Sequence, residues 1–597
     1  MLRLEYPFMF ISLTVALVGA FLLPWLERIS EDRIVSLMSF ILLAIPGFLA
    51  LIISLTFGLQ PGVVEPALFS HPEIGSFAMY LDNLNSLFFL GVGIVTPVVA
   101  LYSYDIMENR LVSMQEEGEN PPSLGIFYLF YTLFSVGMFG FVLTTNLFMQ
   151  YIFLSLALVS SYVLILFYGH GERESVANIY LVWSLVGGAA FFLGVIGLGA
   201  KTGTYDILNL STLELNLGMG AGLPIIVPFL IFFGMSIKMA LFGVHIWLPK
   251  AHSQAPAPVS ALLSGNLIGL SGYVMIRIVI GMFPSQFRIM APFFVILAFL
   301  TMLYGGLNAI AQDDLKTLLA YSSISQMGWI TFGIAIMTQK AMIGGAVLFV
   351  TQSLSSSLLF MGAGVIMHKY DGLRDISNMG ELMTLNPVLS SIIVIGFSTL
   401  IGAPLTVGFW GKTLIFSGAT TVAAGYGPII FILVALAIIF AGGVTASYSL
   451  ITMKRMLFGM FKGDVEPPNI GWSVSTLSMA IVGLTGVILF FTPESIMDPR
   501  EIPRLTVLTV EGLMFLTAYL GAYTIFSGGI RYYLVLLSHK IESEIIDKFF
   551  HKRMISWVEA ADKAIEEAHP TDFSTYLLWL IIGFVTIVSA LVFLFPK

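Results

Sequence analysis

Residues 225–265 read IIVPFLIFFGMSIKMALFGVHIWLPKAHSQAPAPVSALLSG, an apolar run that carries one lysine, Lys238, and turns into a proline-rich stretch. A lysine at membrane depth is energetically expensive, so it marks an ion or proton path by default. It stands about two helical turns before the proline-rich interruption, where freed backbone groups need a wet or protein-lined cavity. The stretch therefore predicts a discontinuous membrane helix with a functional lysine.

A second stretch repeats this arrangement. Residues 401–412, IGAPLTVGFWGK, interrupt another apolar segment and end at Lys412. Two broken hydrophobic helices with one lysine each, in two parts of one chain, are typical of an inverted-repeat transporter. The alternative for both lysines is a side chain that snorkels to the membrane surface.

The composition is that of a membrane protein. Of 597 residues 57% are hydrophobic and 10% are charged, and the mean hydropathy is +0.93. Lipid is therefore the solvent for most of the chain. The absence of cysteine excludes disulfides, thiolate-bound zinc and cysteine-ligated iron–sulfur clusters. We expect no cofactor, metal or catalytic redox centre in this chain, and no motif indicates a nucleic-acid partner.

Hydropathy predicts an all-α, polytopic membrane protein with about sixteen transmembrane helices. The predicted spans are 6–26, 34–58, 84–103, 124–144, 147–168, 176–200, 223–247, 258–281, 288–311, 318–339, 341–367, 386–416, 426–450, 473–492, 507–528 and 573–595.

Lysine and arginine counts predict the orientation. One set of alternate loops, which includes residues 104–122, 248–257 and 529–572, holds 17 of the 27 basic residues, whereas the opposite set holds 8. The two remaining ones are Lys238 and Lys412. Positive charge marks the cytoplasmic face, so both termini are expected outside.

Residues 530–569 are too polar to cross the bilayer, yet they carry one apolar stripe at helical spacing: Ile546, Phe550, Met554, Trp557, Ala561 and Ile565. A helix of this length is a rod of about 58 Å. It is expected on the cytoplasmic side. Two interpretations stay open: an anchor helix lying on the membrane surface, or a lateral strut that packs on a neighbouring subunit.

Four stretches together resemble one family: residues 80–89 (YLDNLNSLFF), 248–265, 313–329 (DDLKTLLAYSSISQMGW) and 402–412. They look like the antiporter-like membrane subunits of respiratory complex I, of its membrane-bound hydrogenase and sulfur reductase relatives, and of Mrp antiporters. The terminal rod with the last span resembles the distal, largest subunit of complex I.

The resemblance implies a division of the chain. We expect N-terminal helices in 1–123, two inverted five-helix repeats in 124–281 and 288–450, and C-terminal helices in 451–528. A lateral helix at 530–569 and a last span in 573–597 follow. The helices near 223–247 and 386–416 should be discontinuous.

The resemblance also implies roles for three lysines. Lys238 matches the central lysine of the first half-channel, and Lys412 matches the lysine that ends the second half-channel toward the outside. Lys316 matches a basic residue at the cytoplasmic start of a helix. A buried lysine suits this work because it can load and release a proton. For Lys316, a solvated residue at the membrane interface is the alternative.

Two histidines accompany the first broken helix. His245 and His252 flank Lys250, close enough to form a cytoplasmic inlet of the ion path. The alternative is that both histidines simply lie at the membrane interface.

The chain departs from the family at four positions. Ser155 stands where the family usually has a glutamate, and Ser264 stands where it has a histidine. Gln352 and Ser356 replace a histidine and a lysine. Hydroxyls and amides can hold a water wire, but they do not titrate near neutral pH. The sequence therefore predicts a partly degraded proton relay, in a copy beside a more complete paralogue.

Three functions stay open. The first is an ion-translocating subunit of a redox-driven complex in a prokaryotic cell membrane, with iron–sulfur clusters on partner subunits. The second is a subunit of a standalone multisubunit cation/proton antiporter, and the third is a scaffold that no longer pumps. The expected partners are other membrane subunits, lipid, protons and possibly sodium.

The predicted orientation can be tested with one cysteine in this cysteine-free chain. Lys552→Cys should react with a membrane-impermeant thiol reagent from the cytoplasmic side only, because basic loops are retained there. The measurement is labelling of sealed vesicles of each orientation. Reaction from the outside alone would overturn the orientation.

Overall fold

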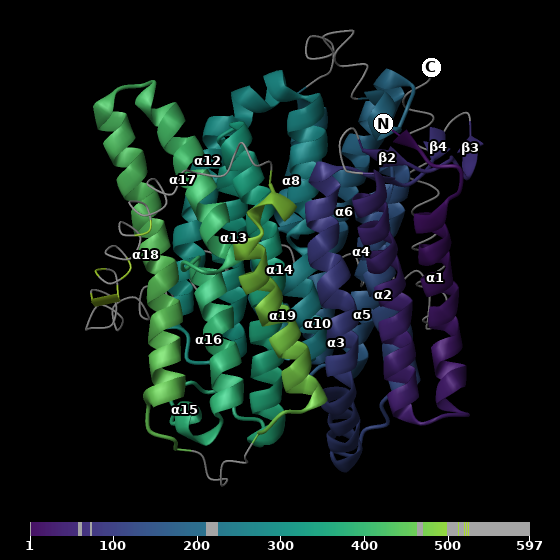
Figure 1. Ribbon diagram of the computed structural model, residues 1–597, viewed down its shortest axis with the longest axis vertical. Helices are drawn as coiled ribbons and strands as arrows, with labels where there is room; N and C mark the ends of the chain where they lie inside the picture. Colours follow the sequence, from purple (N-terminus) through teal and green to yellow (C-terminus); the bar gives the residue numbers. More distant parts are fainter. Residues whose placement is uncertain are drawn as a thin grey trace, which may run out of the picture.

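The computed structural model describes residues 2–57, 62–71, 75–210, 225–462 and 470–497 and the single positions 512, 519, 521, 523 and 524. Long helices run side by side through most of its height (Figure 1). The first fourteen predicted spans fall on described helices. The spans 507–528 and 573–595 and the rod 530–569 lie outside the described residues, apart from the single positions.

The helices follow the predicted division of the chain. The N-terminal ones are α1 (Phe8–Glu27), α2 (Asp32–Phe57) and α3 (Asn83–Glu116). Next come α4 (Leu124–Leu143), α5 (Leu147–Tyr168), α6 (Arg173–Thr202), α8 (Ile226–Lys238), α9 (Trp247–Gln254), α10 (Ala257–Leu262), the π-helix η2 (Leu263–Leu267), α11 (Leu270–Val274) and the π-helix η3 (Met275–Ile280). The later ones are α12 (Pro284–Ala311), α13 (Leu315–Ala335), α14 (Gln339–Lys369), α15 (Leu382–Leu385), α16 (Pro387–Ile401), α17 (Val407–Ala424), α18 (Pro428–Phe458), α19 (Val474–Phe491) and the 3-10 turn η4 (Pro493–Ser495).

Both predicted discontinuous helices are broken, but the first break is not where the prolines predict it. Helix α8 ends at Lys238 itself, and residues 239–246 form the break. Ala240 at φ 52° and Gly243 at φ 90° turn the chain there. The proline-rich stretch instead builds α9 and the start of α10, since Pro249 and Pro258 lie in first turns, where no N–H is needed.

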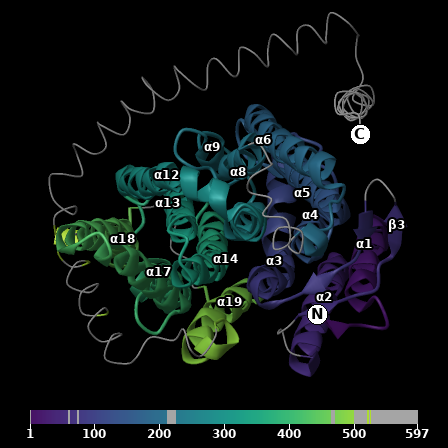
Figure 2. The same cartoon turned by 90° about the horizontal axis from the view of Figure 1, so that it is seen from above.

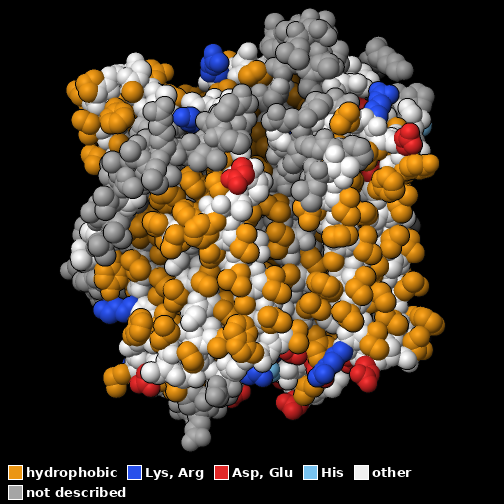
Figure 3. All heavy atoms as spheres, in the orientation of Figure 1, with side chains coloured by type: hydrophobic (Ala, Val, Ile, Leu, Met, Phe, Trp, Pro, Cys, Tyr) orange, Lys and Arg blue, Asp and Glu red, His pale blue; other side chains and the backbone are white. Residues whose placement is uncertain are grey.

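Eleven helices within the described residues are long and apolar enough to cross a membrane, by length and composition. Figure 3 shows apolar side chains over most of the middle of one face, with most charged groups near its two ends. This distribution is that of a protein surrounded by lipid.

Helices α13 and α14 occupy the interior. Viewed from above, α14 lies between α18 at one end and α1 and α2 at the other (Figure 2). It packs against α3, α10, α13, α16, α17 and α19. In α13 every residue except Thr317 is buried. These two helices are thus surrounded by protein rather than by lipid.

Short strands at the face that carries the N-terminus depart from the predicted all-α class. Strand β2 (Val63–Val64) pairs in parallel with β1 (Leu2–Arg3) and antiparallel with β5 (Tyr80–Leu81). A separate hairpin joins β3 (Phe69–His71) and β4 (Gly75–Phe77). Hydropathy misses these strands because each has only two or three residues.

A distant carboxylate caps α1. Pro7 at the N-cap position offers no side-chain acceptor, and Glu65 fills this role after strand β2. Its Oε1 accepts from the Met9 amide at 2.5 Å, and its Oε2 accepts from the Phe10 amide at 3.1 Å. The charge also complements the positive end of the helix dipole. Glu65 thereby joins the first span to the small sheet.

Glu65→Ala should free the first turn of α1 and cost about 1–2 kcal/mol, as loss of a helix cap does. The measurement is hydrogen exchange at residues 9–12, which should speed up. Glu65→Gln keeps one acceptor oxygen and should retain part of the protection, and the exposed Glu31→Ala should change nothing. Equal exchange in all three variants would contradict the capping role.

Candidate functional site

The first break leaves Lys238 buried at the end of its half-helix. The side chain is 4% exposed, and its Nζ has no hydrogen-bond partner among the described residues. Snorkelling is therefore wrong for Lys238, because the ammonium does not reach the surface. Next to it, the Trp247 indole N–H donates to the Ile237 carbonyl at 3.1 Å and satisfies the open end of α8.

Contacts lead from this break to α5 through Ser161 rather than Ser155. The Ser161 hydroxyl lies 2.7 Å from the Tyr180 hydroxyl, and the Tyr180 ring lies 5.4 Å from that of Trp247. The Ser155 hydroxyl is half-buried and donates to the Tyr151 carbonyl of its own helix at 2.9 Å. Sequence reasoning missed Ser161, whose signal is a small polar residue on the same helix.

The second break uses its lysine differently. Lys412, 1% exposed, donates from Nζ to the Ile401 carbonyl at 2.6 Å and the Leu400 carbonyl at 3.2 Å. These carbonyls end α16, where the helix dipole favours a cation. The same Nζ lies 5.2 Å from the Trp329 ring centroid, a cation–π distance. Snorkelling is wrong here too, because the ammonium folds back into the break.

Gly402 makes this fold-back possible. Its φ of 78° is in the left-handed region, and a Cβ there would lie 3.0 Å from the Lys412 Cδ and 3.0 Å from the Gly408 carbonyl oxygen. Tyr519 also donates to the Ile401 carbonyl at 3.2 Å. Sequence reasoning did not single out Tyr519, since nothing in its local pattern reveals a partner 118 residues away.

Lys316 closes a third helix end. It is 1% exposed, and its Nζ donates to the carbonyl of Ala255, the residue that caps α9. The alternative of a solvated interface residue is therefore wrong. Its burial comes from the packing of the start of α13 on α9.

Both predicted inlet histidines are interior groups. His245 accepts at Nδ1 from the Gly243 amide at 3.2 Å, and its ring lies 4.6 Å from that of Tyr304. His252 is fully buried against Phe360, and neither ring nitrogen has a partner among the described residues. The interfacial alternative is wrong for both, whereas an inlet role stays a prediction.

Three of the four family departures meet in one hydroxyl cluster. Ser264, in the π-helix η2, lies 2.5 Å from the Ser323 hydroxyl and 2.8 Å from that of Ser356. Gln352 donates to the Ser264 carbonyl at 3.2 Å. A π-bulge is frequent at functional sites. The sequence did not reveal that Ser323 of α13 completes the cluster.

Helix α13 connects these groups. It begins with Lys316, contributes Ser323, donates from Thr331 to the Met239 sulfur at 3.8 Å, and places Trp329 against Lys412. Hydroxyls, amides and ammonium groups can pass or hold protons. Within the described residues, no group of three His, Asp or Glu side chains could hold a metal ion.

The comparisons agree with this arrangement of broken helices. The family described as NADH:quinone oxidoreductase/Mrp antiporter, transmembrane region, matches residues 144–442, half of the chain, with both breaks and all three lysines inside the match. The chain belongs to this family. The antiporter-like resemblance on the four sequence stretches is thereby confirmed.

Curated members of the family include components of two kinds of complex. NADH-quinone oxidoreductase subunit M of Pseudomonas aeruginosa is 29% identical over 434 residues, 71% of this chain and 80% of that protein. A Na(+)/H(+) antiporter subunit of Alkalihalophilus pseudofirmus is 28% identical over 538 residues, 84% of this chain and 63% of that protein. A chain of the Mrp complex from Dietzia sp. shares the fold, with a TM-score of 0.77, 21% identity and coverage of 99% and 63% of the two chains.

Gly402→Ala should impair ion translocation by this antiporter-like chain, because its methyl group collides with Lys412 and adds about 1–2 kcal/mol of left-handed backbone strain. Gly427→Ala is the matched control, since Gly427 has φ 106° and open space around it. The measurement is ion translocation at equal assembly of the complex. Equal loss in both variants would assign the effect to backbone strain rather than to Lys412.

Proposed function

We propose that this chain is an ion-translocating, antiporter-like membrane subunit of a redox-driven complex in a prokaryotic cell membrane. It moves protons along the buried axis that α13 connects, while electron transfer and its iron–sulfur clusters belong to partner subunits. Both termini lie outside, and the segment 530–569 packs along neighbouring subunits on the cytoplasmic side. Residues 124–281 and 288–450 act as two inverted repeats.

The position of Lys412 supports the proposal most directly. A fully buried ammonium is costly, and here two carbonyls of a broken helix and one indole ring stabilise it. A purely structural helix end could be closed by a neutral donor, as Trp247 closes α8. A lysine adds what an indole lacks, a proton that can leave.

The chemistry of the axis favours protons over sodium. Sodium, like other hard cations, needs oxygen ligands with negative charge. Among the described residues the buried carboxylates are Glu65, which caps α1, and Asp206, which accepts from the Leu208 amide and the Ser76 hydroxyl. Neither residue belongs to the lysine and hydroxyl axis.

The relay of this copy is reduced. Ser264, Gln352 and Ser356 form hydrogen bonds to one another or to backbone, but they have no group that titrates near neutral pH. Protons therefore cross this stretch along hydroxyls and water rather than by stepwise charging of side chains. A more complete paralogous subunit works beside this one in the same complex.

Two other functions have specific support. The 84% coverage of this chain by the antiporter relative favours a subunit of a standalone cation/proton antiporter. The absence of titratable groups in the hydroxyl cluster favours a scaffold. Neighbouring coding sequences decide between the first two: iron–sulfur and large catalytic subunits mean a redox complex, whereas only small antiporter subunits mean the second.

Lys412→Ala and Lys238→Ala should each lower ion translocation by about tenfold or more, because a positioned proton-transfer group typically contributes at least that much. Electron transfer by the partner subunits should continue. The loss at Lys238 should be the smaller one, since Ser155 replaces the family's glutamate. The measurement is translocation by the whole complex in proteoliposomes, together with its electron-transfer rate.

Lys340→Ala is the control, because Lys340 is an exposed lysine at the start of α14. It should leave translocation at the level of the unsubstituted complex. Unchanged translocation in both single variants and in the Lys238→Ala, Lys412→Ala double variant would favour the scaffold.

A further inference from the structure

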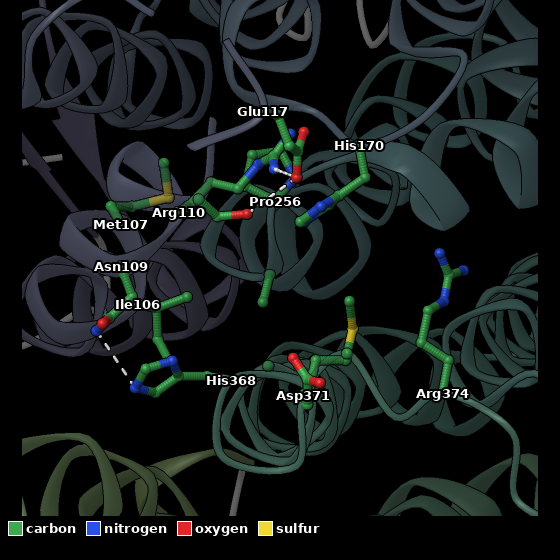
Figure 4. A pocket seen from close by; sticks show the side chains of 15 residues that line it. Ile106, Met107, Asn109, Arg110, Glu117, His170, Pro256, His368, Asp371 and Arg374 are labelled. Carbon is green, nitrogen blue, oxygen red and sulfur yellow. Dashed lines mark hydrogen bonds and ion pairs between the residues drawn. The ribbon is translucent and has the colours of Figure 1, made fainter. Parts of the chain in front are cut away.

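A pocket of about 390 Å³ opens on the face that charge bias predicts to be cytoplasmic. Its walls come from four segments: the end of α3 with Arg110 and Ser113, His170 after α5, Pro256 before α10, and the end of α14 with Met367. In Figure 4 the His170 and Arg110 side chains lie on one side of this space and Asp371 and His368 on another. None of these residues belongs to the lysine and hydroxyl axis.

The deep wall of the pocket is the C-terminal end of α9. The His170 amide donates to the Gln254 carbonyl at 2.8 Å, and the Lys316 Nζ donates to the Ala255 carbonyl. The next residue, Pro256, lines the pocket. His170 and Lys316 thus bind consecutive carbonyls, so a single backbone segment separates the pocket from the buried ammonium.

The charges around the pocket select what can enter it. Burial, followed by the positive charges of Lys316, Arg110 and Arg374, lowers the pKa of His170 to about 2, so its imidazole is neutral. Among the described residues its ring nitrogens have no hydrogen-bond partner. A neutral imidazole has one donor and one acceptor nitrogen and can order water. The nearby guanidinium groups repel metal cations, whereas a proton passes through hydrogen-bonded water.

We propose that this pocket is the water-filled mouth from which Lys316 takes up its protons, an inference that rests on the proposed function. In the uptake step a hydronium ion in the pocket gives its proton to the neutral Lys316 amine, which leaves water and an ammonium group. The water wire past His170 and Pro256 connects the two. This mouth lies on the far side of α9 from the predicted inlet at the buried His252.

The test uses single cysteines in the cysteine-free chain, within the whole complex in proteoliposomes. Ser113→Cys and Met367→Cys line the pocket. Gln115→Cys and Lys369→Cys are their matched controls, exposed positions two residues away on the same helices and outside the pocket. Each variant is treated with a bulky, membrane-impermeant maleimide, and its ion translocation is compared with its own rate before labelling.

Labelling the two lining positions should lower translocation several-fold without lowering electron transfer, whereas labelling the controls should not. The unsubstituted complex, labelled in parallel, corrects for cysteines on partner subunits. Complete labelling of both lining positions, checked by mass spectrometry, with unchanged translocation would overturn the pocket as the mouth. Because Lys412→Ala is measured in the same assay, its loss of translocation would leave the proposed function standing in that case.

Discussion

A helix that ends inside a membrane protein leaves carbonyl groups without partners, and the architecture depends on how these are satisfied. Three such ends lie within this chain. Trp247 satisfies the end of α8, Lys316 that of α9, and Lys412 that of α16. Each donor also lies where the helix dipole concentrates negative charge. The same contacts thus hold the breaks together and keep two ammonium groups inside the protein.

The interior helices can be polar because protein, and not lipid, surrounds them. Helix α13 carries a lysine, serines and a glutamine, yet all but one of its residues are buried. Its neighbour α14 contributes Gln352, Ser353 and Ser356 to contacts with the π-helix η2. Apolar outer helices such as α18 and α1 shield this interior from the bilayer. A polar axis therefore costs little where its hydrogen bonds are satisfied by neighbouring helices.

The two breaks are alike in backbone and unlike in chemistry. Each contains a residue other than glycine at positive φ, Ala240 in the first and Leu405 in the second. Such strain is found where the surrounding structure requires it, often at functional sites. In the second break the lysine binds the open carbonyls, whereas in the first an indole takes that place and Lys238 has no partner among the described residues. The two lysines of one protein thus meet different surroundings.

The sequence by itself determined the positions of the described spans, the existence of two breaks, and the family. Hydropathy and short motifs carry this information because they depend on residues that are neighbours in the chain. Only the tertiary structure decided that α8 ends at Lys238, that His245 and His252 are interior, and that Lys316 is buried. It also brought Ser264 to Ser323 and Ser356, which are 59 and 92 residues away. Such hydrogen bonds follow from helix packing, and no local pattern specifies which buried donor will meet which acceptor.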